Sequence, residues 1–296
     1  MSTSGNAMDN DFARSLKLRD REWGRRHWLP VVFRRTMRLH TGPIVTFTFD
    51  DFPRTAYTVG GAILKSFGAS GTFYTAYGLM NTTDCYSGDQ FRLDDLHCLI
   101  ADGHELASHT FHHVSGRDTS PPEFVQDVLD GRTTMQSVPG LSVSDNFAYP
   151  FGAVTAATKR AVGKIMLSCR STYRGVNRPV VDLNLLRANP LYGGTEQVSM
   201  VRKLLCRNQE LGGWLIFYTH DVQNPHSRYG CAPALLELAV KAALETSMKL
   251  MTVSEVLASA GKPDRSGTDR SCPPDRHVEG RGQEVGDKER INTTHA

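Results

Sequence analysis

Residues 44–49 read Ile-Val-Thr-Phe-Thr-Phe, so that apolar and polar side chains alternate over most of this stretch. Alternation with a period of two residues predicts a β-strand with one face in the core. Residues 214–219 form a nearly continuous apolar run, which is typical of a strand buried inside a parallel sheet. Further strands are predicted at 71–77, 104–108, 146–149 and 165–169, with a short one near residue 250.

Segments with the apolar spacing of helices separate these strands. The predicted helix over 93–102 stops before Gly103, and the helix over 121–138 has proline in its first turn, as helix termini favour. Other helices are predicted at 58–66, 156–164, 197–210 and 233–247, with a last turn at 254–258. This alternation of strands and helices favours a parallel α/β fold, for which a closed or nearly closed barrel is one solution. Such barrels carry their chemistry at the carboxyl ends of the strands.

The chain has 296 residues, which is enough for one large α/β domain with tails. Its hydrophobic content of 40% and charged content of 22% are ordinary for a globular protein. We expect a basic N-terminal arm over 1–40, one α/β domain over 41–260 and a tail over 261–296. The tail lacks aromatic residues and is rich in Gly, Pro and charged residues, so we expect it to be disordered.

The N-terminal arm is strongly basic although the net charge of the whole chain is only +3. Nine Lys or Arg and two acidic residues fall between residues 14 and 38. We interpret the arm as solvated or packed, with Trp23 and Trp28 suggesting that part of it packs on the domain. The alternative is peripheral contact with anionic lipid head groups or an acidic glycan. No recognised nucleic-acid module accompanies the patch, so we expect no nucleic-acid partner.

The six cysteines contain no Cys-x-x-Cys pair, which argues against a zinc ribbon or a thioredoxin-like site. The first forty residues lack the apolar core of a signal peptide, and no segment has the length of a membrane span. We therefore expect a cytoplasmic protein with free thiols.

Candidate chemistry lies in two stretches. Asp50 and Asp51 end the first predicted strand, and the run His109-Thr-Phe-His112-His113 follows a later one. One carboxylate and two imidazoles leave open positions on a divalent metal, as a hydrolytic site needs. The second carboxylate is then free to act as a base. If the histidine stretch is helical, residues four apart face the same way.

These stretches belong to an ordered set of motifs. Thr-Phe-Asp-Asp at 48–51 and His-Thr-x-x-His at 109–113 are accompanied by family-like segments at 68–74, 103–108, 147–152 and 215–220. Over about residues 43–257 the chain resembles the polysaccharide deacetylase family, which includes chitooligosaccharide deacetylases and is also called carbohydrate esterase family 4. The resemblance implies a distorted, incomplete (β/α) barrel with fewer strands than the regular eight.

The resemblance assigns roles to the two stretches. It implies that Asp51, His109 and His113 hold the metal, and that Asp50 is the general base that takes a proton from the attacking water. His112 is the competing ligand, which the family pattern disfavours. Zinc is the first choice of ion, with cobalt or another divalent ion as alternatives.

The resemblance also assigns the leaving-group side. It implies that the backbone N–H of Phe151 stabilises the oxyanion and that His220 is the general acid, a role that suits an imidazole. Many family members have an arginine that pairs with the base where this chain has Ala148. Arg170 and Arg187 are our candidates to support Asp50 instead.

Other departures affect the same side. The family's fourth motif, which supports the acid histidine, is not recognisable, and Asp182 is only a weak substitute. Tyr218 stands where leucine is usual, and we interpret Asp221 as a loop residue. Some aromatic residues are candidates for a sugar subsite, although core positions are commoner for aromatics in strands. These are Tyr74, Tyr77, Phe111, Tyr149 and Trp214.

We predict a metal-dependent hydrolase that removes N-acetyl groups from the amino sugars of an oligo- or polysaccharide. One alternative is an amidase for a non-sugar C–N bond. The other is a non-catalytic glycan-binding relative, which the missing arginine and fourth motif keep open. The sequence leaves the specific glycan and the oligomeric state undetermined.

Overall fold

The structure is a computed structural model that describes residues 28–40, 42–85 and 87–260. Most of the basic arm, with Trp23, and the predicted tail over 261–296 lie outside the described residues. The strands are β1 (Thr36–Arg38), β2 (Ile44–Asp51), β3 (Thr72–Thr75), β4 (Thr83–Asp84), β5 (Gly88–Asp89), β6 (Glu105–Ser108), β7 (Val143–Ala148), β8 (Ser168–Arg170), β9 (Val180–Asp182), β10 (Asn189–Pro190), β11 (Trp214–Thr219) and β12 (Lys249–Leu250).

Helices connect most of these strands. The α-helices are α2 (Ala62–Ser66), α3 (Leu93–Ala101), α4 (Pro121–Ser137), α5 (Ala156–Val162), α6 (Val198–Leu211), α7 (Pro233–Glu245) and α8 (Val253–Ser259). A π-helical turn η1 (Ala56–Gly61) and the 3₁₀ turns η2 (Tyr77–Leu79), η3 (Pro150–Gly152) and η4 (Thr195–Gln197) complete the set. No helix in the described ranges is long and apolar enough to cross a membrane.

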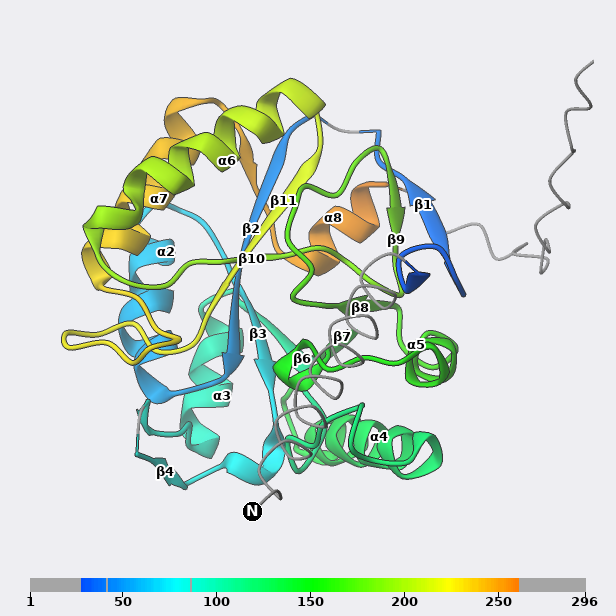
Figure 1. The fold of residues 1–296 in the computed structure, drawn as a ribbon. Helices are drawn as coiled ribbons and strands as arrows, with labels where there is room; N and C mark the ends of the chain where they lie inside the picture. The colour runs from blue at the N-terminus through cyan, green and yellow to red at the C-terminus, as the bar shows by residue number, and fades with distance from the viewer. Residues whose placement is uncertain (1–27, 41, 86, 261–296) are drawn as a thin grey trace, which may run out of the picture. The chain divides into compact units, whose positions relative to one another are not determined.

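The main sheet confirms the predicted fold class. Among the described residues it has eight strands in the order β10-β11-β2-β3-β6-β7-β8, with β12 pairing β2, and every pair is parallel. The sheet curls, so that a bridge between Arg170 and Leu186 joins the β8 edge to the segment that leads into β10. The result is an incomplete α/β barrel (Figure 1).

The alternation along β2 assigns its side chains to two faces. Val45, Phe47 and Phe49 join an outer apolar cluster with residues of the surrounding helices. Thr48 and Asp50 occupy the alternate positions, as the period of a strand requires. Asp50 is thereby aimed into the barrel at the carboxyl end of the strand.

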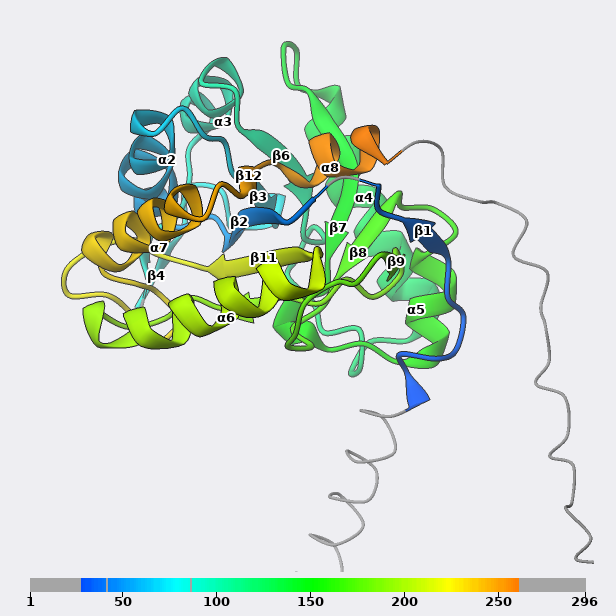
Figure 2. The ribbon, with the colours of Figure 1, turned by 90° about the horizontal axis from the view of Figure 1, so that it is seen from above.

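Helices cover the outer face of the sheet. Helices α2, α6 and α7 lie together along one flank, and α4 and α5 lie together along another (Figures 1 and 2). Helix α8 lies inside the curl of the sheet, where Val253 and Val256 are fully buried with Ile44 and Ile216. This helix fills the amino-terminal end of the barrel and leaves the carboxyl end for the site.

One feature of the fold was not predicted. Strand β1 pairs antiparallel with β9, so that part of the expected arm over 1–40 belongs to the domain. Leu29 is buried there, which agrees with the expectation that part of the arm packs on the domain, although Trp28, one of the two residues that suggested it, is 57% exposed. These strands are three residues long, too short for their alternation to be recognised.

The cysteines of the described ranges are free. Two are buried, and neither those two nor the exposed ones form a disulfide. They are Cys85, Cys98, Cys169, Cys206 and Cys231.

Candidate metal centre and active site

Three predicted ligands converge at the carboxyl end of the sheet. Asp51 ends β2, and His109 and His113 lie in the loop that follows β6. The Asp51 Oδ1 atom is 2.9 Å from His113 Nε2 and 3.4 Å from His109 Nε2. The three ligand atoms lie within 4.8 Å of one another. Segments far apart in the sequence thus place one carboxylate and two imidazoles around a common point.

The backbone around these ligands is unusual. Asp51, Thr110 and His113 have φ angles of 65°, 69° and 56°, in the left-handed region that non-glycine residues rarely adopt. The stretch 109–113 is therefore a loop, and the condition that it is helical is not met. Such strained positions persist where the surrounding structure fixes them, often at functional sites. At the end of β2 the left-handed turn interrupts the alternation that would otherwise place Asp51 on the opposite face from Asp50.

The contacts of these side chains fit a cation. Asp51 Oδ1 is a buried oxygen without a well-formed hydrogen bond, and a carboxylate with two imidazole nitrogens is a donor set that divalent metals accept. The His109 Nδ1 atom lies 2.8 Å from the carbonyl oxygen of Ala148. If Nδ1 carries the proton, it donates to that carbonyl, and the lone pair of Nε2 is left facing Asp51. Histidines that bind a metal commonly make such a hydrogen bond with their other ring nitrogen.

Electrostatics favours the ionised form of the carboxylate. Burial raises the pKa of Asp51, but the close imidazoles of His109 and His113 and the charge of His220 outweigh it, so that the pKa lies well below its usual value. Burial lowers the pKa of His113, and its hydrogen bond and charge interaction with Asp51 reverse the effect, giving a raised pKa. The site therefore holds a negative oxygen among positive or polarisable nitrogens.

His112, the competing ligand, has another role. Its side chain is 65% exposed, and its Nδ1 atom lies 2.6 Å from Asp127 Oδ1 on helix α4. The second oxygen of Asp127 accepts hydrogen bonds from the backbone N–H groups of Phe111 and His112. Asp127 therefore ties the histidine loop to α4, and the structure does not bring His112 to the metal centre.

Asp50 lies beside this centre with a buried partner. Arg170 Nη2 donates to both carboxylate oxygens of Asp50, at 2.6 and 2.5 Å. Arg170 is fully buried, with its guanidinium carbon 5.1 Å from the ring centre of Tyr74 and 4.9 Å from that of Tyr218. The tyrosine at 218, unusual for the family motif, thus forms one wall of the arginine site.

The register of the sheet explains why Arg170 takes this place. Ala148 on β7 and Arg170 on β8 are paired in register, and side chains at paired positions of a parallel sheet share a face. The small Ala148 side chain leaves room for the arginine of the next strand. The structure therefore brings Arg170 to Asp50, as one of our two alternatives predicted.

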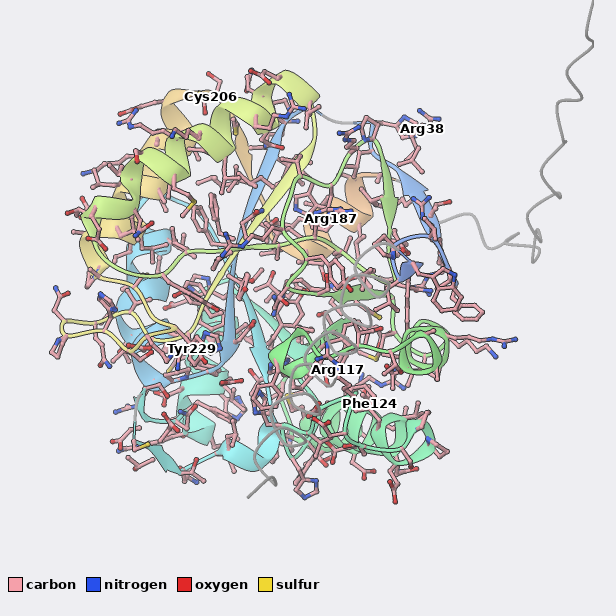
Figure 3. All side chains as sticks on the ribbon, in the orientation of Figure 1. Arg38, Arg117, Phe124, Arg187, Cys206 and Tyr229 are labelled. Carbon is pink, nitrogen blue, oxygen red and sulfur yellow. The ribbon has the colours of Figure 1, made fainter. Side chains whose placement is uncertain are left out.

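The second alternative, Arg187, was wrong. Its Nη1 atom donates to the carbonyl of Arg174 at 2.9 Å, and its side chain lines a separate cavity. Figure 3 shows Arg187 well apart from Tyr229, which contacts His220. Arg187 lies in the long segment between β8 and β10, whose path places its side chain away from Asp50. No local pattern in the sequence indicates this path.

His220 faces the centre from the other side. It follows β11, and its Nε2 atom lies 3.7 Å from Asp51 Oδ2. Its Nδ1 atom lies 3.2 Å from the carbonyl oxygen of Tyr229. With the proton on Nδ1, this backbone carbonyl takes the place of the supporting carboxylate that the fourth family motif would supply.

Asp182, the weak substitute for that motif, and Asp221 both have structural roles. Asp182 accepts a hydrogen bond from Lys159 Nζ at 2.7 Å and lies on β9, so it does not support His220. Asp221 is fully buried and accepts hydrogen bonds from the N–H and hydroxyl groups of Ser227. It thereby holds the loop that presents the Tyr229 carbonyl, in agreement with its assignment as a loop residue.

Most aromatic candidates for a sugar subsite are core residues. Tyr74, Tyr149 and Trp214 are at most 1% exposed, and a sugar cannot reach them. Tyr77 and Phe111 are partly buried and pack on each other with ring centres 6.1 Å apart. The burial of Tyr74 and Trp214 in the inner apolar cluster and of Tyr149 in the cluster beside α4 decides their role, and local sequence does not reveal it.

Other aromatic residues border the site instead. Phe151 is 69% exposed with a φ of 59°, and its ring centre is 4.5 Å from that of His113. Tyr229 is 45% exposed and lies with Tyr192 next to His220, at ring distances of 5.6 and 6.1 Å. Tyr192 and Tyr229 were missed because they lie in loops without a strand or helix pattern.

Fold and site together define an α/β barrel protein with a candidate metal centre at the carboxyl ends of its strands. Residues 39–168 match the model of the polysaccharide deacetylase family. This match includes Asp51, His109 and His113 and confirms the resemblance that the motifs indicated. No curated protein matches the sequence significantly.

Solved structures of the family share the fold at low sequence identity. A putative polysaccharide deacetylase from Mycobacterium smegmatis is 16% identical, with a TM-score of 0.54 over 73% of this chain and 89% of the other. The chitin deacetylase of the fungal pathogen Colletotrichum lindemuthianum is 16% identical, with a TM-score of 0.51 over 76% and 91%. A carbohydrate esterase family 4 pseudoenzyme from Bacillus anthracis is 15% identical, with a TM-score of 0.47 over 74% and 66%. The first two similarities support the fold alone, and no argument is drawn from the third.

Proposed function

We propose that the protein is a metal-dependent N-deacetylase that acts on N-acetylated amino sugars of an oligo- or polysaccharide. The observation that supports this proposal is the convergence of Asp51, His109 and His113 beside a separate carboxylate, Asp50, held by a buried arginine. The match to the family model agrees with a hydrolase of this kind. The chitin deacetylase with the same fold has a substrate of this class by its name.

We propose that the three ligands hold a divalent cation, with zinc as the first choice. A cation bound there would supply Lewis-acid activation of water and of the acetamide carbonyl. All three donors are the nitrogen and oxygen atoms that zinc and cobalt accept.

Asp50 and His220 carry out the two proton transfers of the reaction. The Asp50 carboxylate, fixed by its two hydrogen bonds with Arg170, accepts a proton from the attacking water. His220 donates a proton from Nε2 to the leaving amine while Nδ1–H stays on the Tyr229 carbonyl. The backbone N–H of Phe151, at the strained turn next to His113, contributes to oxyanion stabilisation.

The test is acetate release from short N-acetylglucosamine oligomers. General acid and base residues contribute about 10²–10⁴-fold, so Asp50→Asn and His220→Asn should each reduce the rate by about that factor and keep the bound metal. His112→Asn is the matched control, because this exposed imidazole lies outside the centre, and it should keep most of the activity.

Other outcomes would select a different function. Acetate or ammonia release from small amides, without release from the sugars, would identify an amidase. Glycan binding without any hydrolysis by the metal-loaded protein, unchanged in Asp50→Asn, would identify a non-catalytic binding protein.

A further inference from the structure

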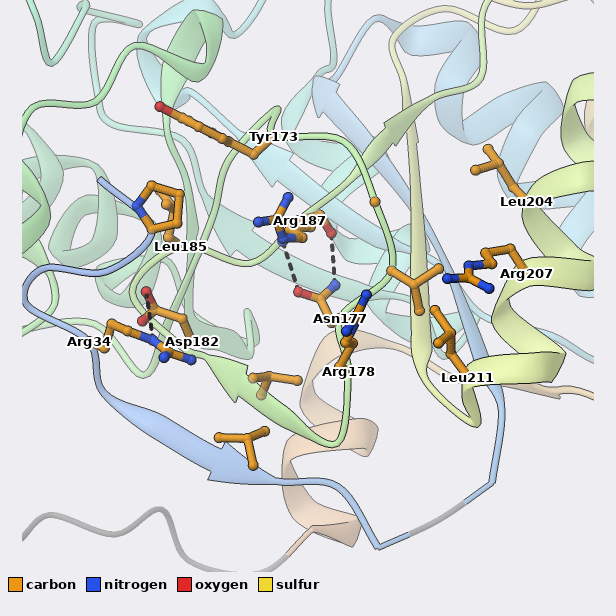
Figure 4. A pocket seen from close by; sticks show the side chains of 15 residues that line it. Arg34, Tyr173, Asn177, Arg178, Asp182, Leu185, Arg187, Leu204, Arg207 and Leu211 are labelled. Carbon is orange, nitrogen blue, oxygen red and sulfur yellow. Dashed lines mark hydrogen bonds and ion pairs between the residues drawn. The ribbon is translucent and has the colours of Figure 1, made fainter. Parts of the chain in front are cut away.

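A second cavity, of about 460 Å³, lies away from the metal centre. It is bounded by β9, the loop that precedes β9 and the last turns of α6 (Figure 4). One lining residue, Asn177, bridges Trp214 at the start of β11, whereas His220 follows the other end of this strand. Six residues of strand span about 20 Å at roughly 3.3 Å each, so the cavity is separate from the catalytic end.

The lining of this cavity is strongly basic. Among the residues that the structure describes, four guanidinium groups and one acidic side chain, that of Asp182, line it. Asp182 is already bound by the buried Lys159 at 2.7 Å. The carboxylate therefore leaves most of the arginine charge without compensation. The four arginines are Arg34, Arg178, Arg187 and Arg207.

The hydrogen-bond donors of these arginines are mostly available. Within the described ranges Arg178 is exposed and has no hydrogen-bond or ion-pair partner. Arg187 uses Nη1 for a backbone carbonyl. Arg207 pairs with Glu210 at 2.8 Å, but both side chains are more than half exposed, and such pairs are weak and easily exchanged. Arg34 is 4.0 Å from Asp182.

We propose that this cavity binds a phosphate or diphosphate group of a ligand. At the candidate active site the single guanidinium of Arg170 donates to both carboxylate oxygens of Asp50. By comparison, the four guanidinium groups of the cavity carry more positive charge than the single carboxylate of Asp182 can balance. Guanidinium groups match the oxygens of phosphates in paired hydrogen bonds. Leu185, Leu204 and Leu211 add apolar walls that suit an organic portion of the same ligand.

The same phosphate chemistry has two sources, a soluble phosphorylated molecule and a lipid head group. Inorganic pyrophosphate, titrated by calorimetry at low ionic strength, probes the first. Co-sedimentation with vesicles of phosphatidylglycerol in phosphatidylcholine probes the second. Binding in either experiment should weaken as salt is added, because charge drives it.

Variants place the binding in the cavity. The double variant Arg178→Gln with Arg187→Gln should bind pyrophosphate or the anionic vesicles about tenfold more weakly or worse, since each loses charge-assisted hydrogen bonds. Arg207→Gln and Arg202→Gln form a matched pair on α6, because both arginines are exposed and paired with a glutamate. Only Arg207 lines the cavity, so only its loss should weaken binding.

The outcomes separate this proposal from the deacetylase proposal. Acetate release should stay unchanged in all these variants. If the double variant fails to fold, Arg178→Glu tests the site instead, because Arg178 is at an exposed position. Absence of pyrophosphate and vesicle binding by the wild-type protein would overturn the proposal. Equal binding by the double variant and Arg202→Gln would overturn it as well, whether or not acetate is released.

Discussion

Arg170→Met tests the pairing on which the arrangement around Asp50 depends. The variant removes both hydrogen bonds to a carboxylate that is 4% exposed and keeps much of the apolar volume between Tyr74 and Tyr218. Removing one partner of a buried ion pair leaves the other charge unpaired and costs about 3–5 kcal/mol. We expect the free energy of unfolding to fall by that amount and acetate release to be lost, because the base is no longer oriented.

Urea denaturation near neutral pH, followed by linear extrapolation, measures the change. Arg202→Met is the matched control, because its pair with Glu245 is 3.8 Å long and more than half exposed, and its stability should not change measurably. The exchange Ala148→Arg with Arg170→Ala adds a sharper test. The two positions are in register, so an arginine on β7 should recover part of the lost stability and activity. If Arg170→Met is as stable and active as the wild type, our reasoning about this pair is wrong.

Three further predictions concern the loop and the core. His113→Ala should lose the bound metal in elemental analysis, whereas His112→Ala should retain it. Burial lowers the pKa of His104 in the folded protein. The contribution of neutral His104 to stability is therefore present above the unfolded pKa of about 6.5 and is lost as the pH falls below that value. The free energy of unfolding, measured from neutral pH downward, should decline less in His104→Gln than in the wild type. Gly131→Ala should lower the free energy of unfolding by about 1–3 kcal/mol, because the new Cβ would lie 2.6 Å from the Thr110 carbonyl oxygen. It should also reduce the metal content, because Thr110 lies between the ligands His109 and His113. Unchanged stability and metal content would contradict this.

The ligands of the candidate centre were predictable because their motifs are local. Asp50 and Asp51 end a strand with clear alternation, and His109 and His113 follow another strand. Carboxyl ends of parallel strands meet at one edge of the sheet, so the sequence order of these motifs was enough to bring them together. The backbone of the histidine loop was not predictable, because its left-handed residues are fixed by Asp127 and Gly131 of α4.

The supports of Asp50 and His220 depended on contacts between distant segments. Arg170 and Arg187 were equal candidates in the sequence, and only the strand register placed Arg170 beside Asp50. The partner of His220 is a backbone carbonyl, which carries no side-chain signature at Tyr229. The basic cavity likewise joins arginines from four separate segments.

The sequence by itself determined the alternation of strands and helices, the incomplete α/β barrel and the three metal-ligand candidates. Each of these depends on short-range patterns, in which spacing of two to four residues fixes which side chains share a face. The tertiary structure alone decided which arginine holds Asp50, what orients His220 and which aromatic residues reach the solvent. Those outcomes depend on strand register and loop paths, and both are set by packing between residues far apart in the chain.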